Sequence, residues 1–290
     1  MNFFNTIITK PFGWVLFQLF ELVGSYGVAL ILFTVFSKLI LLPFQMKSKK
    51  SMVDMQRLQP KLKELEKKYK NDKEKYSIAV QKLYKSENVS MMGGCLPLLI
   101  TMPIMLGLYA VVRQPLTYMF GFNADLIKQI ADIVGVATEN MSMSNLEIQI
   151  ASRMGEFQTQ LTAIIPNLRV IDFHFLGIDL AGVPQFTQVT TLWIIPILSG
   201  ATSFGYSWIV KRYQGPAAAE NQQANMMSGC TTYMMPLMSV YIAFVVPAGL
   251  GFYWIINNLL MMAQEPALNW YYTKYKPSVA AKKTGGETKK

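Results

Sequence analysis

Charged residues are scarce in this chain. Only 15% of its 290 residues are charged, whereas soluble domains carry about 25%. Hydrophobic residues make up 52%, so the composition predicts an integral membrane protein. The net charge of +10 would suggest a nucleic-acid partner in a soluble protein. In a membrane protein, the placement of basic residues along the chain predicts topology instead.

Cysteine and histidine are rarer still. The two cysteines, Cys95 and Cys230, each stand at the start of an apolar run, which excludes a disulfide framework or a cysteine metal cluster. The single histidine, His174, is interpreted as structural. The sequence also lacks an HExxH motif, a Ser–His pairing and a Walker-type loop. We therefore expect no enzyme, no catalytic residue, no cofactor and no bound metal.

The first long apolar run covers residues 26–44 and contains one charge, Lys38. As a helix it is just long enough to cross a hydrocarbon core of about 30 Å. A lysine at the centre of such a span costs about 2.5–3.5 kcal/mol. Two interpretations stay open. Lys38 could snorkel toward the polar run that opens at Gln45, or it could join Thr34 and Ser37 in a polar stripe that favours a hydrated functional environment.

Residues 1–25 are semi-apolar and rich in aromatic side chains. We interpret them as a short external helix in the membrane interface, with Trp14 and the phenylalanines in the membrane. A signal peptide is the competing interpretation. Against it stand the missing basic n-region and the missing A-x-A-like cleavage site.

A basic region follows the first run. Residues 45–90 contain thirteen Lys and Arg against six acids, and this excess predicts a cytoplasmic location. Apolar residues recur there at helical spacing, at Leu58, Leu62, Leu65 and Tyr69. After a break at Asn71-Asp72, a second helix carries Tyr76, Val80, Leu83 and Tyr84. The pattern predicts a helical hairpin.

Residues 113–190 carry four basic residues against seven acids, so we expect this connection to be external. Apolar spacing predicts a short amphipathic helix at Leu126, Ile127, Ile130, Ile133 and Val134. A further helix is expected within 146–165, and 173–184 is expected to be an irregular return segment.

The last apolar stretch, 230–264, is 35 residues long, or about 52 Å as one helix. Pro247-Ala248-Gly249 supplies a turn that divides it into two spans. A single span would export the six lysines of the C-terminal tail, against the positive-inside rule. The distribution of charge therefore predicts an all-α protein with five transmembrane helices, N-out and C-in. The predicted segments are an interfacial helix 1–25, spans 26–44, 95–112, 191–210, 230–246 and 250–264, a hairpin 45–93, an external loop 113–190, a cytoplasmic loop 211–229 and a basic tail 266–290.

Several motifs occur in one order along the chain. They are PFGW followed by SYGVALILFTVFSKLILLPF, then MQRLQPKLKELEKKYKNDKEKY with KLYKSENV, GGCLPLLITMPIMLGLY, FLGIDL and PAGLGFYWIINNLLMMAQ. On these motifs the chain, from about Pro11 to Tyr272, resembles the YidC/Oxa/Alb family of membrane-protein insertases. The resemblance implies a bacterial short form without a large periplasmic domain, although residues 123–165 look like an insertion in the external loop.

The resemblance also implies a hydrophilic groove enclosed by the five spans and open to the cytoplasm and to lipid. The family's positive charge in the first span is usually arginine and matches Lys38, which keeps the charge but lacks the planar fork. Further groove positions match Thr101, Tyr206, Trp254 and Asn258, beside Thr34 and Ser37 of the polar stripe.

The resemblance implies an insertase and chaperone for nascent membrane proteins in a bacterial plasma membrane. The alternative function is a small anion transporter or channel that uses Lys38. A purely structural assembly factor would pair Lys38 with an internal acid. We expect the ribosome as a transient partner, through the hairpin residues Arg57, Lys61, Lys67 and Lys68 and the tail. The Sec translocon and the signal-recognition-particle receptor are further candidate partners, and the protein is expected to work as a monomer in the lipid bilayer.

Overall fold

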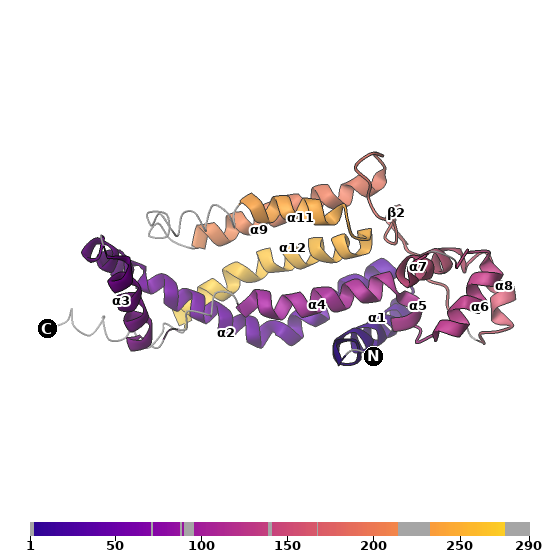
Figure 1. Ribbon diagram of the computed structural model, residues 1–290, viewed down its shortest axis with the longest axis horizontal. Coiled ribbons are helices and arrows are strands. Elements are labelled where there is room, and N and C mark those ends of the chain that lie inside the picture. Colours follow the sequence, from indigo (N-terminus) through magenta and orange to yellow (C-terminus); the bar gives the residue numbers. More distant parts are fainter. Residues whose placement is uncertain are drawn as a thin grey trace. The chain divides into compact units, whose positions relative to one another are not determined.

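The structure, a computed structural model, describes residues 3–70, 72–87, 89, 96–138, 141–166, 168–213 and 233–275, with the backbone alone for 96–100 and 275. This part of the chain is almost entirely helical (Figure 1). Its helices are η1 (Asn5–Thr9), α1 (Lys10–Val23), α2 (Tyr26–Lys68), α3 (Lys73–Ser86), α4 (Leu96–Arg113), α5 (Pro115–Tyr118), α6 (Ala124–Val134), α7 (Met143–Arg153), α8 (Gln158–Thr162), η3 (Thr191–Trp193), α9 (Ile194–Tyr213), α11 (Met235–Ala243), α12 (Ala248–Trp270) and η6 (Tyr271–Tyr275). The strands β1 (His174–Phe175) and β2 (Ile178–Asp179) form one antiparallel pair. Both cysteines lie outside the described side chains.

The chain divides into two compact units. Unit 1 comprises Met1–Lys38, Thr101–Gly200 and Met238–Asn257, and unit 2 comprises Leu39–Ile100, Ala201–Leu237 and Asn258–Lys290.

One apolar core runs through unit 1. Leu16 of α1, Leu30 of α2, Leu108 of α4, Ile127 of α6 and Ile150 of α7 are all fully buried in it. Helices α6 and α7 therefore share a core with the apolar helices that flank them in the sequence. Burial of each such side chain contributes about 1.5–3 kcal/mol.

The N-terminal helix packs closely against α5. A Cβ added to Gly13 of α1 would lie 2.1 Å from the backbone oxygen of Tyr118, at the end of α5. Any larger residue at position 13 would therefore force the two helices apart. An ion pair between Glu21 and Arg169 (3.1 Å) also joins α1 to the segment after α8.

Helix α2 does not end where the predicted first span ends. It continues beyond Phe44 to Lys68 as a single helix of 43 residues, with Pro43 and Pro60 inside it. At about 1.5 Å per residue this is about 64 Å, far longer than a membrane requires. The change from apolar to basic composition alters the surroundings of the helix and not its backbone, since glutamine, methionine and lysine are all good helix formers.

The hairpin of unit 2 consists of the C-terminal part of α2 and helix α3. Leu58 and Leu62 are buried, as the helical spacing predicts. The carboxylate of Asp72 accepts a hydrogen bond from the backbone N–H of Lys75 (3.0 Å), so Asp72 caps α3. Asn71 lies outside the described residues.

The C-terminal apolar stretch forms two helices, but its turn precedes the predicted one. The turn covers 244–247, so that Ala248 and Gly249 already open α12. Their backbone N–H groups donate to the carbonyl oxygens of Gly182 (2.8 Å) and Leu180 (2.7 Å). The return segment thereby satisfies two of the orphan donors at the start of α12.

Within the residues that the structure describes, three helical stretches are long and apolar enough to cross a membrane: Asn5–Val23, Tyr26–Lys68 and Thr191–Tyr213. Thr101–Arg113 is apolar but shorter. The N-terminal helix, which the sequence predicts to lie in the interface, thus also meets the length criterion for a span.

Candidate functional site

The polar stripe predicted on α2 lies on the buried side of that helix in unit 1. Thr34 is 1% exposed and Ser37 is 8% exposed, while Lys38 is half-buried. The Thr34 hydroxyl donates to the backbone oxygen of Leu30 (2.7 Å), so its hydrogen-bonding capacity is partly used within the helix. Neighbouring Phe36 is 44% exposed. Helix α2 therefore presents an apolar side outward and its polar side inward.

The Lys38 side chain has no ion pair or hydrogen bond among the described residues of unit 1. The acid that the sequence places at the edge of the last span, Glu265, pairs instead with Lys49 in unit 2. Glu265 is therefore already engaged by another lysine. A half-buried ammonium without a counter-charge is a strong attractor for an anionic group.

Two further candidates belong to unit 1. Trp254 lies on α12 between the buried residues Tyr253 and Ile255 and is itself half-buried. Thr101 lies on α4 and is also half-buried. Both are therefore available in part for contact with a substrate or with lipid.

The last two candidates belong to unit 2. Asn258 is 5% exposed, and its amide nitrogen donates to the hydroxyl oxygens of Ser203 (2.8 Å) and Thr202 (3.3 Å). This polar contact joins α12 to α9. Tyr206 lies one turn further along α9 and is half-buried.

Sequence reasoning missed a set of polar links between α2 and α12 in unit 2. The Gln264 amide donates to the Gln45 side-chain oxygen (2.6 Å). Next along both helices is a buried ion pair between Lys49 and Glu265, whose side chains are 5% and 12% exposed. We name these two contacts the α2–α12 clamp. The only signal in the sequence is that Glu265 is the sole acid between residues 221 and 286.

The four hairpin residues expected to contact partners fall into two groups. Arg57 donates to the backbone oxygen of Tyr272 (3.3 Å), and Lys61 pairs with Glu87. Lys67 and Lys68 are exposed. Arg57 and Lys61 therefore already serve the folded hairpin, which leaves Lys67 and Lys68 as the better candidates for a partner.

Polar contacts attach α7 to the end of α4 and to α5. The guanidinium of Arg113 donates to the side chains of Asn145 (2.7 Å) and Ser144 (3.3 Å) on α7. Buried Glu147, also on α7, accepts from the backbone N–H (2.9 Å) and the hydroxyl (2.6 Å) of Thr117. Burial raises the pKa of the Glu147 carboxyl, and the hydrogen bonds from Thr117 offset part of this rise.

This buried carboxyl predicts a pH dependence of the inserted helices. Because the pKa of Glu147 is higher in the folded state, the folded state binds the proton more tightly. Its contribution to stability is therefore complete below the ordinary carboxyl range and is lost as pH rises through the raised pKa. Hydrogen-exchange protection factors of α5 and α7 should fall with rising pH, and Glu147→Gln should flatten that slope.

The matched control is Glu156→Gln, because Glu156 is exposed in the same insertion. It should leave the slope unchanged. An unchanged slope in the Glu147→Gln variant would show that another group titrates. Glu147→Ala should destabilise the insertion by about 1–3 kcal/mol, because the buried backbone N–H of Thr117 loses its acceptor.

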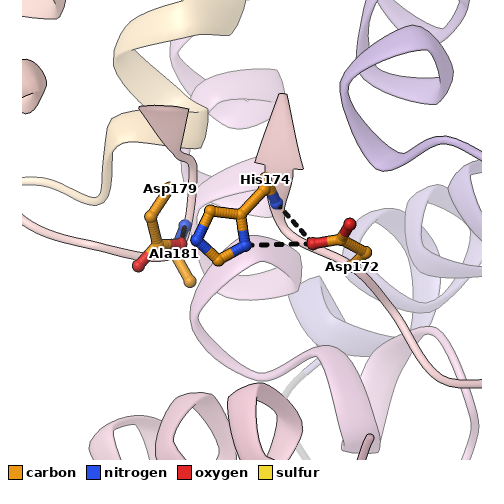
Figure 2. A network of polar contacts seen from close by, with 4 residues as sticks. All are labelled: Asp172, His174, Asp179 and Ala181. Atoms are coloured by element: carbon orange, nitrogen blue, oxygen red, sulfur yellow. Dashed lines mark hydrogen bonds and ion pairs between the residues drawn. The ribbon is translucent and has the colours of Figure 1, made fainter. Parts of the chain in front are cut away.

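The return segment, expected to be irregular, contains the β1–β2 hairpin (Figure 2). The Asp172 carboxylate accepts from the backbone N–H (2.9 Å) of His174 and contacts its ring nitrogen Nδ1 (3.0 Å). Asp179 accepts from the backbone N–H of Ala181 (2.9 Å). These contacts lower the pKa of Asp172, mainly through the backbone N–H of His174. Both aspartates stabilise local turns, so the histidine has a structural partner.

The fold and these contacts define a class of protein. The described part of the chain is a helical membrane protein with several apolar helices, a cation on the polar side of one of them, and a basic helical hairpin. The 60Kd inner membrane protein family matches residues 18–275. The chain therefore belongs to this family, which places it in the membrane of a bacterial cell.

Relatives are similar over most of the chain. The membrane protein insertase YidC of Geobacter sp. (strain M21) is 30% identical over 262 residues, which is 90% of this chain and 37% of that protein. The protein of the same name from Fusobacterium nucleatum is 27% identical over 265 residues. The match covers 91% of this chain and 96% of that protein. The chain thus spans little more than a third of several relatives and almost all of another.

One solved structure supports the fold. The crystal structure of an active YidC insertase with its first transmembrane domain resolved matches 91% of this chain and 47% of that chain, with a TM-score of 0.53 and 20% identity.

Proposed function

We propose that the protein is a membrane protein insertase and chaperone, working without a catalytic centre or nucleotide of its own. The family and the printed function of its relatives support this proposal. The observation that carries it is Lys38: a half-buried cation on the polar side of an apolar helix, without a counter-charge in the described part of unit 1. An ammonium in such a position costs free energy unless an anionic ligand repays it.

The physical task of an insertase is to lower the barrier for a polar external segment of a nascent chain. A carboxylate about 4 Å from an ammonium gains about 1 kcal/mol in water and about 4 kcal/mol at an effective dielectric constant of 20. Lys38 would therefore attract acidic substrate segments into the membrane region. In our proposal, Thr34, Ser37, Thr101, Tyr206, Trp254 and Asn258 line a hydrophilic groove that brings water partway across, and substrate helices leave into lipid.

The proposed topology has five transmembrane segments with the N-terminus outside and the C-terminus inside. The first segment occupies only the N-terminal part of α2, and the rest of α2 extends into the cytoplasm as one arm of the hairpin. The positive charge of that arm supports this direction. A C-terminal tag that proteases reach from outside intact cells would contradict it.

Proposed partners follow from the charge of the hairpin and the tail. Exposed Lys67 and Lys68 can attract ribosomal phosphates without sequence specificity. The contact is transient in our proposal, and the Sec translocon and the signal-recognition-particle receptor are further partners. If ribosome co-sedimentation is unchanged in a Lys67→Ala, Lys68→Ala variant, these two lysines have no part in the contact.

Reconstitution tests the function directly. The full chain is placed in phospholipid vesicles, and a single-span substrate with an acidic external tail is synthesised beside them. The tail should become protected from protease only in vesicles that contain the chain. The same vesicles are assayed for chloride flux. Flux without tail protection would replace the insertase with the rival function, an anion channel that uses Lys38.

A further inference from the structure

The loop before α9 holds an unusual group of apolar side chains. We name residues 183–193 the Phe186 loop. Phe186 is 58% exposed and Val189 is 81% exposed, although both belong to a segment of defined conformation. Nothing in the proposed insertion mechanism uses them.

Hydrogen bonds fix the backbone of the loop. Gln185 and Gln188 form an antiparallel bridge that closes a tight turn around Phe186. The indole nitrogen of Trp193 donates to the backbone oxygens of both Gln185 (2.9 Å) and Gln188 (3.0 Å). One side chain at the end of η3 therefore holds both sides of the turn.

Aromatic packing fixes the loop against Phe244, the residue that directly follows α11. The Phe186 ring stacks on Phe244 with centroids 3.9 Å apart, and Trp193 meets the same ring edge-on at 5.0 Å. Phe244 itself is buried. The other side of the Phe186 ring stays exposed, so the loop presents this ring outward in a fixed position.

The surroundings of the loop identify its occupant. Residues 183–210 contain no charged side chain. Ile194 and Ile197, which follow the loop on the candidate span α9, are 47% and 60% exposed, and Val245 beside Phe244 is 53% exposed. Side chains of this kind on a membrane-family helix face lipid, and the apolar surface of the loop continues theirs. Alternating apolar and uncharged polar residues with an indole suit the headgroup layer.

We propose that the Phe186 loop binds phospholipid, with Phe186 and Val189 inserted at the boundary between headgroups and acyl chains of the leaflet in which α9 begins. The carbonyl oxygens of the preceding return segment accept hydrogen bonds from the backbone N–H groups at the start of α12, and η3 leads directly into α9. The loop thereby sets the depth at which both helices begin. This inference rests on the membrane location of the family and not on insertase activity.

Depth-dependent quenching tests the proposal. Cys95 and Cys230 are replaced by serine, and the full chain receives one cysteine with a fluorescent label, either by Val189→Cys or by Gln149→Cys on α7. Both positions are exposed. In phosphatidylcholine–phosphatidylglycerol vesicles, the label at 189 should be quenched several-fold more by a nitroxide on the upper acyl chain than the label at 149. Iodide supplied on both sides should show the reverse order.

Equal quenching of both labels by iodide would overturn the proposal, and so would protection of the label at 189 from both quenchers, which indicates a protein occupant. A second variant tests the anchor itself. Phe186→Ser should make the label at 189 more accessible to iodide, while Thr187→Ser, in the same turn, should not. If the accessibility of the label at 189 to iodide is unchanged in the Phe186→Ser variant, Phe186 does not contribute to membrane anchoring.

Discussion

Replacing Lys38 with alanine should reduce insertion of a substrate with an acidic external tail by about a hundredfold, because about 3 kcal/mol of attraction is lost when the carboxylate finds no cation in a medium of low dielectric constant. Lys38→Arg should insert close to the wild-type level, since arginine keeps the charge. Lys38→Glu should be worse than Lys38→Ala because it repels the same carboxylate. Insertion is measured in cells depleted of their own insertase, at equal expression.

A second comparison in this experiment varies the substrate. Removing the acids of its external tail should partly restore insertion by the Lys38→Ala variant, because the missing attraction is then no longer needed. The matched control is Lys47→Ala, an exposed lysine on the same helix, which should insert normally. If Lys38→Ala inserts as well as the wild type, Lys38 merely snorkels, and hydration of the groove must account for the activity.

Local features of the fold follow from the sequence. The spacing of Ile127, Ile130 and Val134 predicts α6, and all three are buried. Asn123 accepts from the backbone N–H of Leu126 (2.8 Å) and Gly135 has a φ of +68°, so the helix begins and ends at residues suited to its caps. Here propensity, periodicity and capping all favour the same structure.

The β-hairpin could not be predicted in this way. Its two central residues, Leu176 and Gly177, have φ values of +51° and +77°, and leucine seldom adopts such a conformation. Tertiary packing supplies what the local sequence lacks. Tyr26 meets Phe173 edge-on with centroids 4.9 Å apart, and Phe175 lies against Gly27, where an added Cβ would come within 2.2 Å of its ring.

In the candidate site, too, local sequence identifies some residues but not their long-range contacts. Periodicity alone identifies the stripe of Thr34 and Lys38 on one side of α2. The contact of Asn258 with Ser203, by contrast, joins residues 55 positions apart, and the partner of Glu265 lies 216 positions away. No local pattern encodes such pairs, so a single sequence identifies the charged groups without identifying their partners.

The second large effect is a loss of stability that we expect when the α2–α12 clamp is broken. Lys49→Met should destabilise the protein by about 3–5 kcal/mol, because it leaves the Glu265 carboxylate buried without its counter-charge. The double variant Lys49→Met, Glu265→Leu should recover most of that loss, since removal of both charges also removes the desolvation penalty. The free energy of unfolding in detergent micelles measures both, and hydrogen exchange of residues 264–272 locates the effect.

The exposed pair of the hairpin is the matched control. The Lys61 side chain is 49% exposed, and Lys61→Met should therefore cost less than about 1 kcal/mol. Equal losses for Lys49→Met and Lys61→Met would mean that water reaches the clamp and screens it. A double variant as unstable as Lys49→Met would mean that the pair contributes net attraction. Only recovery of the free energy of unfolding in the double variant supports our interpretation of the clamp. In that interpretation the two charges fix which faces of α2 and α12 meet but add little net stability.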